Sequence, residues 1–381
     1  MNWKTLSALL VASSLLLTGC GADEDELVPN PLPEIEATVE FEKIWDISVG
    51  SGVDERLLKL SPAYGYNKIY AADVDGVVKA INPENGDTVW ERELEADISG
   101  GVSVGNLHVA VGTRDGQIIL LDAETGEDKW QAQTSSEIIS APAIDDGYVV
   151  VRTVDGMIYT YAVDSGERQW FYDKTLPSLT LRGTSAPVIS RGAAISGFAN
   201  GKVGVFLLDG GRLAWEKQIS APSGRSELER IVDVDAQPLV FGSTLYAASY
   251  NGNVISIELR SGETLWQREL STFRDMSIHS QLLLVAHDNS YVSALNRNSG
   301  AILWTQKDLF LRNLSKPVAF GGHVVVGDYE GYLHILDKDT GQLIGQESVS
   351  SSGIIANPLV LDDKLVILTR DGDLIAYKKQ S

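Results

Sequence analysis

The 381-residue chain has a single cysteine, Cys20, together with three methionines and five histidines. One cysteine excludes an intrachain disulfide and any metal site built from several thiolates. The five histidines form no pair at the short spacing typical of a metal site. The sequence also has no phosphate-binding loop, no serine-nucleophile elbow and no distinctive carboxylate pair. We therefore expect no catalytic site, no cofactor and no metal.

Positive charge is scarce as well. The 31 lysines and arginines are outnumbered by 52 aspartates and glutamates, which leaves a formal net charge of −21. A surface of this sign repels the phosphates of nucleic acid and anionic lipid headgroups. We expect no nucleic-acid partner, and contact with a membrane only through a covalent anchor. Basic or mixed protein surfaces remain compatible with this charge.

One long apolar run is present, and it lies at the N-terminus. Lys4 precedes the apolar residues from Leu6 to Leu17. The run is shorter than the roughly 20 residues that a transmembrane helix needs, and its pattern is typical of an export signal. We expect residues 1–19 to be a signal peptide that is absent from the mature fold.

The next residues, Leu17-Thr18-Gly19-Cys20, resemble the lipobox of bacterial lipoproteins, which implies that Cys20 is the lipidated first residue. Gly21 after the cysteine, rather than aspartate, favours the outer membrane by the same resemblance. A lone buried thiol is the alternative for Cys20. Residues 20–40 are acidic and contain prolines, so we expect a flexible or extended tether.

The rest of the chain is a repeat marked by Asp-Gly-like pairs. The second residues of these pairs are Gly76, Gly116, Gly156, Gly201, Gly252, Ser290, Gly331 and Gly372. Fourteen residues after the first seven of them stand Trp90, Trp130, Trp170, Trp215, Trp266, Trp304 and Gly345. Fourteen residues before all eight stand Pro62, Val102, Pro142, Pro187, Pro238, Met276, Pro317 and Pro358. Landmarks about 40 to 50 residues apart indicate one closed array rather than several domains.

Each unit is predicted to contain four short strands. In the second unit the turn residues Asp115-Gly116 and Thr125-Gly126 separate strands expected over 101–104, 107–113, 117–122 and 129–133. Such units predict an all-β, eight-bladed β-propeller of four-stranded antiparallel blades. Proline suits the start of the innermost strand, because it cannot donate to a ladder. The tryptophan falls on the outer strand, where we expect it to pack between blades.

The eighth unit lacks an outer strand, since Ser381 comes before the expected tryptophan position. The segment Phe41–Ile47 supplies a strand with Trp45 at its centre. We predict that this N-terminal strand completes the last blade, so that residues 41–381 form the propeller. Closure protects two sheet edges that would otherwise be exposed.

The repeat varies in length between each tryptophan position and the next proline position. From Trp45 onward these gaps are 17, 12, 12, 17, 23, 10, 13 and 13 residues. The longest, from Trp215 to Pro238, adjoins one of the two 17-residue gaps, from Trp170 to Pro187. Both belong to connections that lie on the face of the Asp-Gly hairpins. Adjacent insertions on one face of a repeat protein predict a binding site.

The first insertion contains Leu179, Leu181 and Arg182, an alternation of leucines with small polar residues that ends in an arginine. This pattern suits an exposed contact with two apolar anchors and a planar charged group. The alternative is an ordinary loop folded back onto its blade.

The second insertion contains Ser226 and Glu229 at capping-box spacing, which predicts a short helical turn. Asp233 and Asp235 follow it. They could hold Arg182, contact a basic partner or supply part of the oxygen shell of a cation. A solvated acidic loop is the alternative.

The repeat around Asp122-Ala123-Glu124-Thr125-Gly126 resembles that of pyrroloquinoline-quinone dehydrogenase propellers. Nearly the whole chain more closely resembles the BamB family, lipoproteins of the outer-membrane β-barrel assembly (BAM) machinery. Besides the lipobox and the eight repeats, three segments carry this resemblance: 177–187, 233–235 and 326–334.

The resemblance implies a non-catalytic scaffold, anchored on the periplasmic face of the outer membrane, that binds the periplasmic (POTRA) domains of BamA. The residues that match the partner-binding positions are Leu179, Leu181, Arg182, Asp233 and Asp235. Unfolded outer-membrane protein clients are a further expected partner. The alternative is a quinone-dependent dehydrogenase or another ligand-binding periplasmic propeller.

Overall fold

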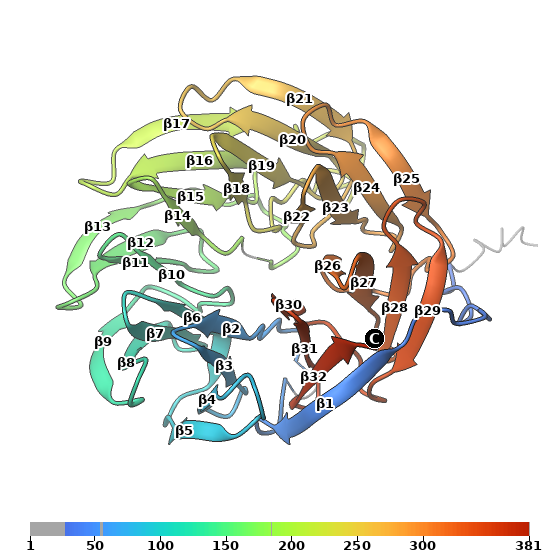
Figure 1. Cartoon of the computed structure of the whole chain (residues 1–381). Coiled ribbons are helices and arrows are strands. Elements are labelled where there is room, and N and C mark those ends of the chain that lie inside the picture. The colour runs from blue at the N-terminus through green and yellow to red at the C-terminus, as the bar shows by residue number, and fades with distance from the viewer. Residues whose placement is uncertain (1–26, 54–55, 184, 381) are drawn as a thin grey trace, which may run out of the picture.

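Each repeat folds as a four-stranded antiparallel sheet, and the computed structural model places eight such sheets around one axis (Figure 1). The structure describes residues 27–53, 56–183 and 185–380. These ranges hold 32 strands, so the predicted all-β, eight-bladed propeller is confirmed. They contain no helix suited to crossing a membrane. The predicted signal peptide and Cys20 lie outside them.

The strands follow one another from the axis to the rim within every blade. Blades 1 to 3 consist of β2 (Ala63–Gly65), β3 (Lys68–Ala72), β4 (Val77–Ile81), β5 (Thr88–Glu93); β6 (Ile98–Gly105), β7 (His108–Thr113), β8 (Gln117–Asp122), β9 (Asp128–Gln133); and β10 (Ala143–Asp145), β11 (Tyr148–Arg152), β12 (Ile158–Ala162), β13 (Arg168–Tyr172). Blades 4 to 6 consist of β14 (Val188–Ser190), β15 (Ala193–Gly197), β16 (Lys202–Leu207), β17 (Leu213–Gln218); β18 (Leu239–Phe241), β19 (Thr244–Ala248), β20 (Asn253–Glu258), β21 (Thr264–Glu269); and β22 (Ser277–His279), β23 (Leu282–Ala286), β24 (Val292–Asn296), β25 (Ile302–Gln306).

Blade 7 consists of β26 (Val318–Phe320), β27 (His323–Gly327), β28 (Tyr332–Asp337) and β29 (Leu343–Ser348). Blade 8 combines β30 (Leu359–Leu361), β31 (Lys364–Leu368) and β32 (Asp373–Lys379) with β1 (Phe41–Ser48) from the other end of the chain. Strand β1 pairs with β32 from Phe41 opposite Lys379 to Ser48 opposite Asp373. The predicted closure of the ring is thereby confirmed.

The Asp-Gly pairs form the turns between the second and third strands. Gly116 has a φ of +77°, a left-handed conformation that glycine adopts at little cost. Three residues earlier, the Thr113 hydroxyl accepts the Gln117 amide at 2.9 Å and closes the turn from inside. Each of the six prolines at this repeat position directly precedes the innermost strand of its blade, as predicted; Pro142, for example, precedes β10. These strand starts therefore lose no ladder hydrogen bond.

The tryptophans on the outer strands join each blade to the next. Trp130 donates its Nε1 hydrogen to the Val163 carbonyl at 2.7 Å, and its ring lies against Gly166 in the turn of the following blade. The same hydrogen bond is made by all seven tryptophans on outer strands: Trp45, Trp90, Trp130, Trp170, Trp215, Trp266 and Trp304. Their predicted packing role is confirmed. The buried apolar residues form eight clusters, each shared by two adjacent blades.

Blade 7 departs from this pattern, because Gly345 replaces the tryptophan. The chain that leads into β1 crosses this position, and a Cβ at Gly345 would come within 2.4 Å of the Val39 carbonyl oxygen. Thr38 and Val39 both donate their amides to the Ile344 carbonyl, at 2.8 and 3.3 Å. Main chain therefore occupies the space that an indole fills elsewhere. Residues 27–40 contain no strand, yet the ring holds them at β29 of blade 7 and, through Asn30, at the connection between β25 and β26.

Candidate partner-docking site

The segments that join one blade to the next share a face of the ring with the Asp-Gly hairpins; we call it the connection face. Main-chain hydrogen bonds tie the two sets together: the Tyr250 amide donates to the Asp233 carbonyl and the Val154 amide to the Glu137 carbonyl, both at 2.9 Å. The two adjacent insertions predicted to form a binding site run between β13 and β14 and between β17 and β18. They therefore lie side by side, as the strand alternation predicts.

The first insertion presents its predicted residues to solvent. Leu179 and Leu181 are 41% and 38% exposed. The Arg182 side chain is 69% exposed, and its Nη2 lies 2.6 Å from Glu137 Oε2, on the connection between β9 and β10. The Glu137 side chain is only 15% exposed, so the arginine end of this ion pair is the part that is open to a partner.

Asp233, in the second insertion, is fully buried and holds the first one in place. Its Oδ2 accepts the Leu181 amide at 2.7 Å, while Oδ1 is buried without a hydrogen-bond partner among the described residues. Burial raises the pKa of Asp233 to about 6, against the opposing effects of the Leu181 amide and Arg152. Asp233 thus fixes the backbone from which Leu181 projects, rather than presenting a charge to a partner.

Asp235 packs beneath the same loop. A Cβ at Gly183 would lie 2.1 Å from Asp235 Oδ2, so the close approach of loop and carboxylate depends on a glycine. Burial and repulsion by Asp233 raise the pKa of Asp235 to about 7, although Arg152 and Lys59 oppose this shift. Neither aspartate bonds to Arg182. Of the roles open to the two carboxylates, positioning of the loop is the one that the contacts support.

Sequence reasoning missed Arg152, a buried charged residue beside the two aspartates. It ends β11, is 1% exposed, and donates from Nη1 to the Gly197 carbonyl. Burial lowers its pKa to about 10, while Asp235 and Asp233 act to raise it. A signal was available in the repeat. The residues at this fifth strand position are Ala72, Gly112, Arg152, Gly197, Ala248, Ala286, Gly327 and Leu368, and only one of them is charged.

The capping box of the second insertion is present without a helix. The Ser226 hydroxyl accepts the Glu229 amide at 3.2 Å, and Glu229 Oε2 accepts the Ser226 amide at 3.1 Å. Residues 227–230 form turns, in which the Arg230 amide donates to the Glu227 carbonyl at 3.2 Å and the Ile231 amide to the Leu228 carbonyl at 3.3 Å, so the predicted short turn is present but is not continued into a helix. Two reciprocal bonds satisfy these amides locally, and four residues are too few for a helix to propagate.

Beside this site, a polar network centred on Asp275 links connections from different sides of the ring. Asp275, which precedes β22, accepts Lys59 Nζ and Asn357 Nδ2, both at 2.6 Å, and the Gln237 amide at 2.7 Å. These groups come from blades on opposite sides of the ring. Among the described residues, no group of three or more His, Cys, Asp or Glu side chains is arranged to hold a metal ion. The exposed side chains of the site are two leucines and an arginine, which are residue types suited to contact with another protein.

The raised pKa of Asp235 predicts that the free energy of unfolding depends on pH. With a folded pKa of about 7 against an ordinary 3.8, Asp235 keeps its proton in the folded chain at pH values where the unfolded chain has released it. The free energy of unfolding should therefore fall as pH rises from 3.8 to 7. We expect Asp235→Asn to reduce this fall by at least ~1 kcal/mol, since one pKa unit corresponds to about 1.4 kcal/mol. Urea unfolding at pH 4, 5.5 and 7 measures it, and parallel curves for the two chains would contradict it.

Comparison with known proteins shows which family this chain is similar to. A family model described as outer membrane protein assembly factor BamB matches residues 74–306 and 288–381. The chain is similar to curated proteins of that description from Pseudomonas aeruginosa and Escherichia coli. It is 48% identical to the former, over 99% of both chains, and 40% identical to the latter, over 96% of this chain and 97% of the relative.

Solved structures agree with this match. BamB from Moraxella catarrhalis aligns with a TM-score of 0.81 and 26% identity, covering 89% of this chain and all of that one. A quinohemoprotein alcohol dehydrogenase from Pseudomonas putida aligns with a TM-score of 0.70 over 91% of this chain and 78% of its own length. At 15% identity, the second match shows the shared propeller fold alone.

Proposed function

Since this chain belongs to the BamB family of outer membrane protein assembly factors, we propose that it serves outer-membrane protein assembly as a non-catalytic docking subunit. Its partner is the periplasmic part of BamA, and its contact surface is the first insertion. Leu179 and Leu181 supply apolar area, and Arg182 supplies a charge that is open to a partner. Asp233 and Asp235 act from below as positioning residues.

One observation carries this proposal. Asp233 is buried and uses its carboxylate to hold the Leu181 amide at 2.7 Å, while the side chains of Leu181 and Arg182 remain exposed. A loop whose backbone is fixed loses little conformational entropy on binding. Large apolar groups beside an arginine are typical of the residues that dominate protein interfaces.

The membrane anchor belongs to the same proposal. Lipidation of Cys20 would hold the propeller at the periplasmic face of the outer membrane. The ring fixes the chain again at Asn30, whose amide donates to the Phe310 carbonyl at 3.0 Å. Ten residues span at most about 36 Å, so the connection from Cys20 to Asn30 keeps blade 7 close to the membrane.

Unfolded clients are a second proposed contact. The outer strands β13, β21 and β25 expose Phe171, Leu265 and Leu303, each to 53–54%. Each outer strand pairs with one neighbour in its sheet and so has one edge open to another chain. Addition of an extended client strand at such an edge would satisfy backbone groups and cover these side chains.

A quinone-dependent dehydrogenase is the rival function, and the site gives it little support. The axis beside the docking loop is occupied by the bonds of Asp275 to Lys59 and Asn357. Addition of the quinone with calcium, followed by a search for a bound chromophore, tests this alternative directly.

The proposal is tested by replacing Leu181 and Arg182 together with alanine. We expect the affinity for BamA to fall about 30-fold or more, because interface hot spots each contribute about 2 kcal/mol or more. The matched control is Arg212→Ala with Leu213→Ala on blade 4, where Leu213 is 37% exposed against 38% for Leu181. Co-purification from solubilised membranes is the measurement. A Leu181/Arg182 variant that recovers as much BamA as the control would refute the site.

A further inference from the structure

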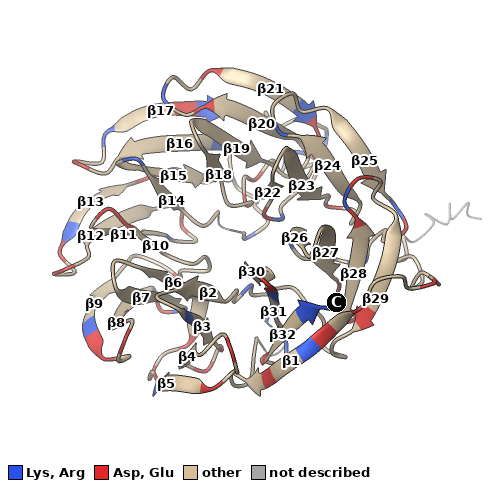
Figure 2. Ribbon diagram, in the orientation of Figure 1, with Lys and Arg blue, Asp and Glu red and all other residues tan. Residues whose placement is uncertain are grey.

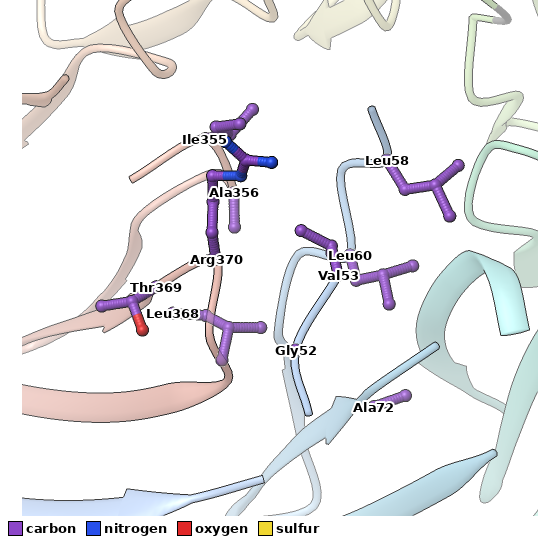
Figure 3. A pocket seen from close by; sticks show the side chains of 10 residues that line it. All are labelled: Gly52, Val53, Leu58, Leu60, Ala72, Ile355, Ala356, Leu368, Thr369 and Arg370. Atoms are coloured by element: carbon purple, nitrogen blue, oxygen red, sulfur yellow. The ribbon is translucent and has the colours of Figure 1, made fainter. Parts of the chain in front are cut away.

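A third insertion on the connection face, between β1 and β2, presents a leucine that the fold does not bury. Leu58 and Leu60 point inward from this segment and line a small apolar cavity together with residues of blades 1 and 8 (Figure 3). Leu60 is 2% exposed, and Leu58 packs against the core shared by blades 1 and 2. The neighbouring Leu57 is 93% exposed, more than any other large apolar side chain in the described ranges. Its backbone is therefore held while its side chain points outward.

Leu57 shares its surroundings with the proposed docking loop. Leu57 and Leu181 line the same two hollows of the connection face, with volumes of about 300 and 390 Å³. Ile139 lines both hollows as well, and Phe273 and Ile355 extend the second one toward the ring axis. One isolated exposed leucine would be unremarkable, whereas apolar residues gathered around a hollow mark an interaction surface.

The lining of these hollows contains more cations than acids, unlike the chain as a whole. Charged residues of both signs lie on the outer strands and turns (Figure 2), within a net charge of −21. The two hollows are lined by five cations and two acids, namely Arg56, Lys59, Arg114, Arg182 and Arg274 with Glu137 and Asp235. Arg56, Lys59 and Arg182 form ion pairs with Asp97, Asp275 and Glu137, at 3.8, 2.6 and 2.6 Å. Among the described residues, Arg114 and Arg274 are the lining cations that form no ion pair. Asp235 is only partly ionised near neutral pH, because its pKa is about 7. A surface with carboxylates is the complementary one.

We propose that Leu57 is a further apolar anchor of the docking surface, and that the partner domain bound by Leu181 and Arg182 covers it with an apolar group flanked by carboxylates. Leu57 and Leu181 line both hollows, so one folded domain is able to contact both residues. This inference rests on the proposed function and extends its contact surface from blades 3–5 to the junction of blades 8 and 1.

The test compares Leu57→Ser with Leu107→Ser in the full-length lipidated chain, using full-length BamA in detergent. Leu107 is 64% exposed in the turn between β6 and β7, on the opposite face. We expect Leu57→Ser to weaken binding about tenfold or more, because a leucine that becomes fully buried on binding loses that contribution. Leu107→Ser should leave the affinity within twofold of the original chain. Thermal unfolding of both variants should be unchanged, since neither side chain is packed.

Two outcomes separate this inference from the proposed function. If the Leu181/Arg182 variant loses binding while Leu57→Ser equals Leu107→Ser, the extension to Leu57 is refuted and the proposed site stands. If the Leu181/Arg182 variant binds BamA normally, the proposed site fails, and the shared docking surface fails with it. Weaker binding at higher ionic strength, with a smaller salt effect in Arg114→Gln, would support the carboxylate-bearing partner.

Discussion

Replacing Asp275 with alanine is expected to lower the free energy of unfolding by about 3–5 kcal/mol, the usual cost of removing one partner from a buried ion pair. Asp275 is 5% exposed and accepts Lys59 Nζ and Asn357 Nδ2, both at 2.6 Å. Burial alone would raise its pKa, but Lys59 and Lys316 hold the pKa well below its usual range. Without the carboxylate, the ammonium groups of Lys59 and Lys316 would be left near each other without their counter-charge.

Urea unfolding followed by tryptophan fluorescence measures this change. The control is Asp128→Ala, which removes an exposed partner of Arg92 at 3.1 Å and should cost less than about 1 kcal/mol. Asp275→Asn keeps acceptor oxygen for the Gln237 amide and removes only the charge, so an intermediate loss is expected. If Asp275→Ala and Asp128→Ala were equally stable, the axial network would not hold the ring together.

The blades could be predicted from the sequence because their determinants are local. A turn such as Asp115-Gly116 and a proline such as Pro142 each act within a few residues of their own position. The tryptophan needs only the next repeat, since Trp130 packs on Gly166. A strand order that repeats itself therefore follows from spacing alone. Closure by Phe41–Ser48 followed from counting strands, because seven complete blades and one incomplete blade leave one strand to find.

The interior of the site could not be read in the same way. Spacing placed Asp233 beside the first insertion, but it left open whether the carboxylate faces solvent or the Leu181 amide. That depends on the packing of three blades, as does the burial of Arg152 between them. The pair Lys59–Asp275 is separated by 216 residues, and no local pattern connects its members. The missing tryptophan at Gly345 likewise becomes intelligible only when Val39 is seen to cross it.

Arg312→Ala is expected to have an effect of similar size, about 3–5 kcal/mol, on the free energy of unfolding. The Arg312 side chain is 1% exposed and lies 2.7 Å from Asp328, which is fully buried and also accepts His334 Nε2 at 2.8 Å. Arg312 contacts Glu330 as well, and its Nη1 donates to the Asn30 carbonyl at 3.1 Å. Its removal would leave the buried Asp328 carboxylate without its arginine partner, and would release the N-terminal segment from blade 7.

The release of that segment distinguishes this prediction from a general loss of stability. The Asn30 amide, bonded to the Phe310 carbonyl at 3.0 Å, should exchange its hydrogen faster in Arg312→Ala, whereas the amides of β11 far from blade 7 should change only with global stability. Arg230→Ala is the control, because Arg230 is 53% exposed and forms a long, exposed ion pair with Glu227 at 3.9 Å. Unchanged exchange at Asn30 would mean that the Phe310 contact alone holds the segment. Faster exchange there, with β11 still protected, would show that the buried charges of blade 7 fix the path between the propeller and its proposed anchor.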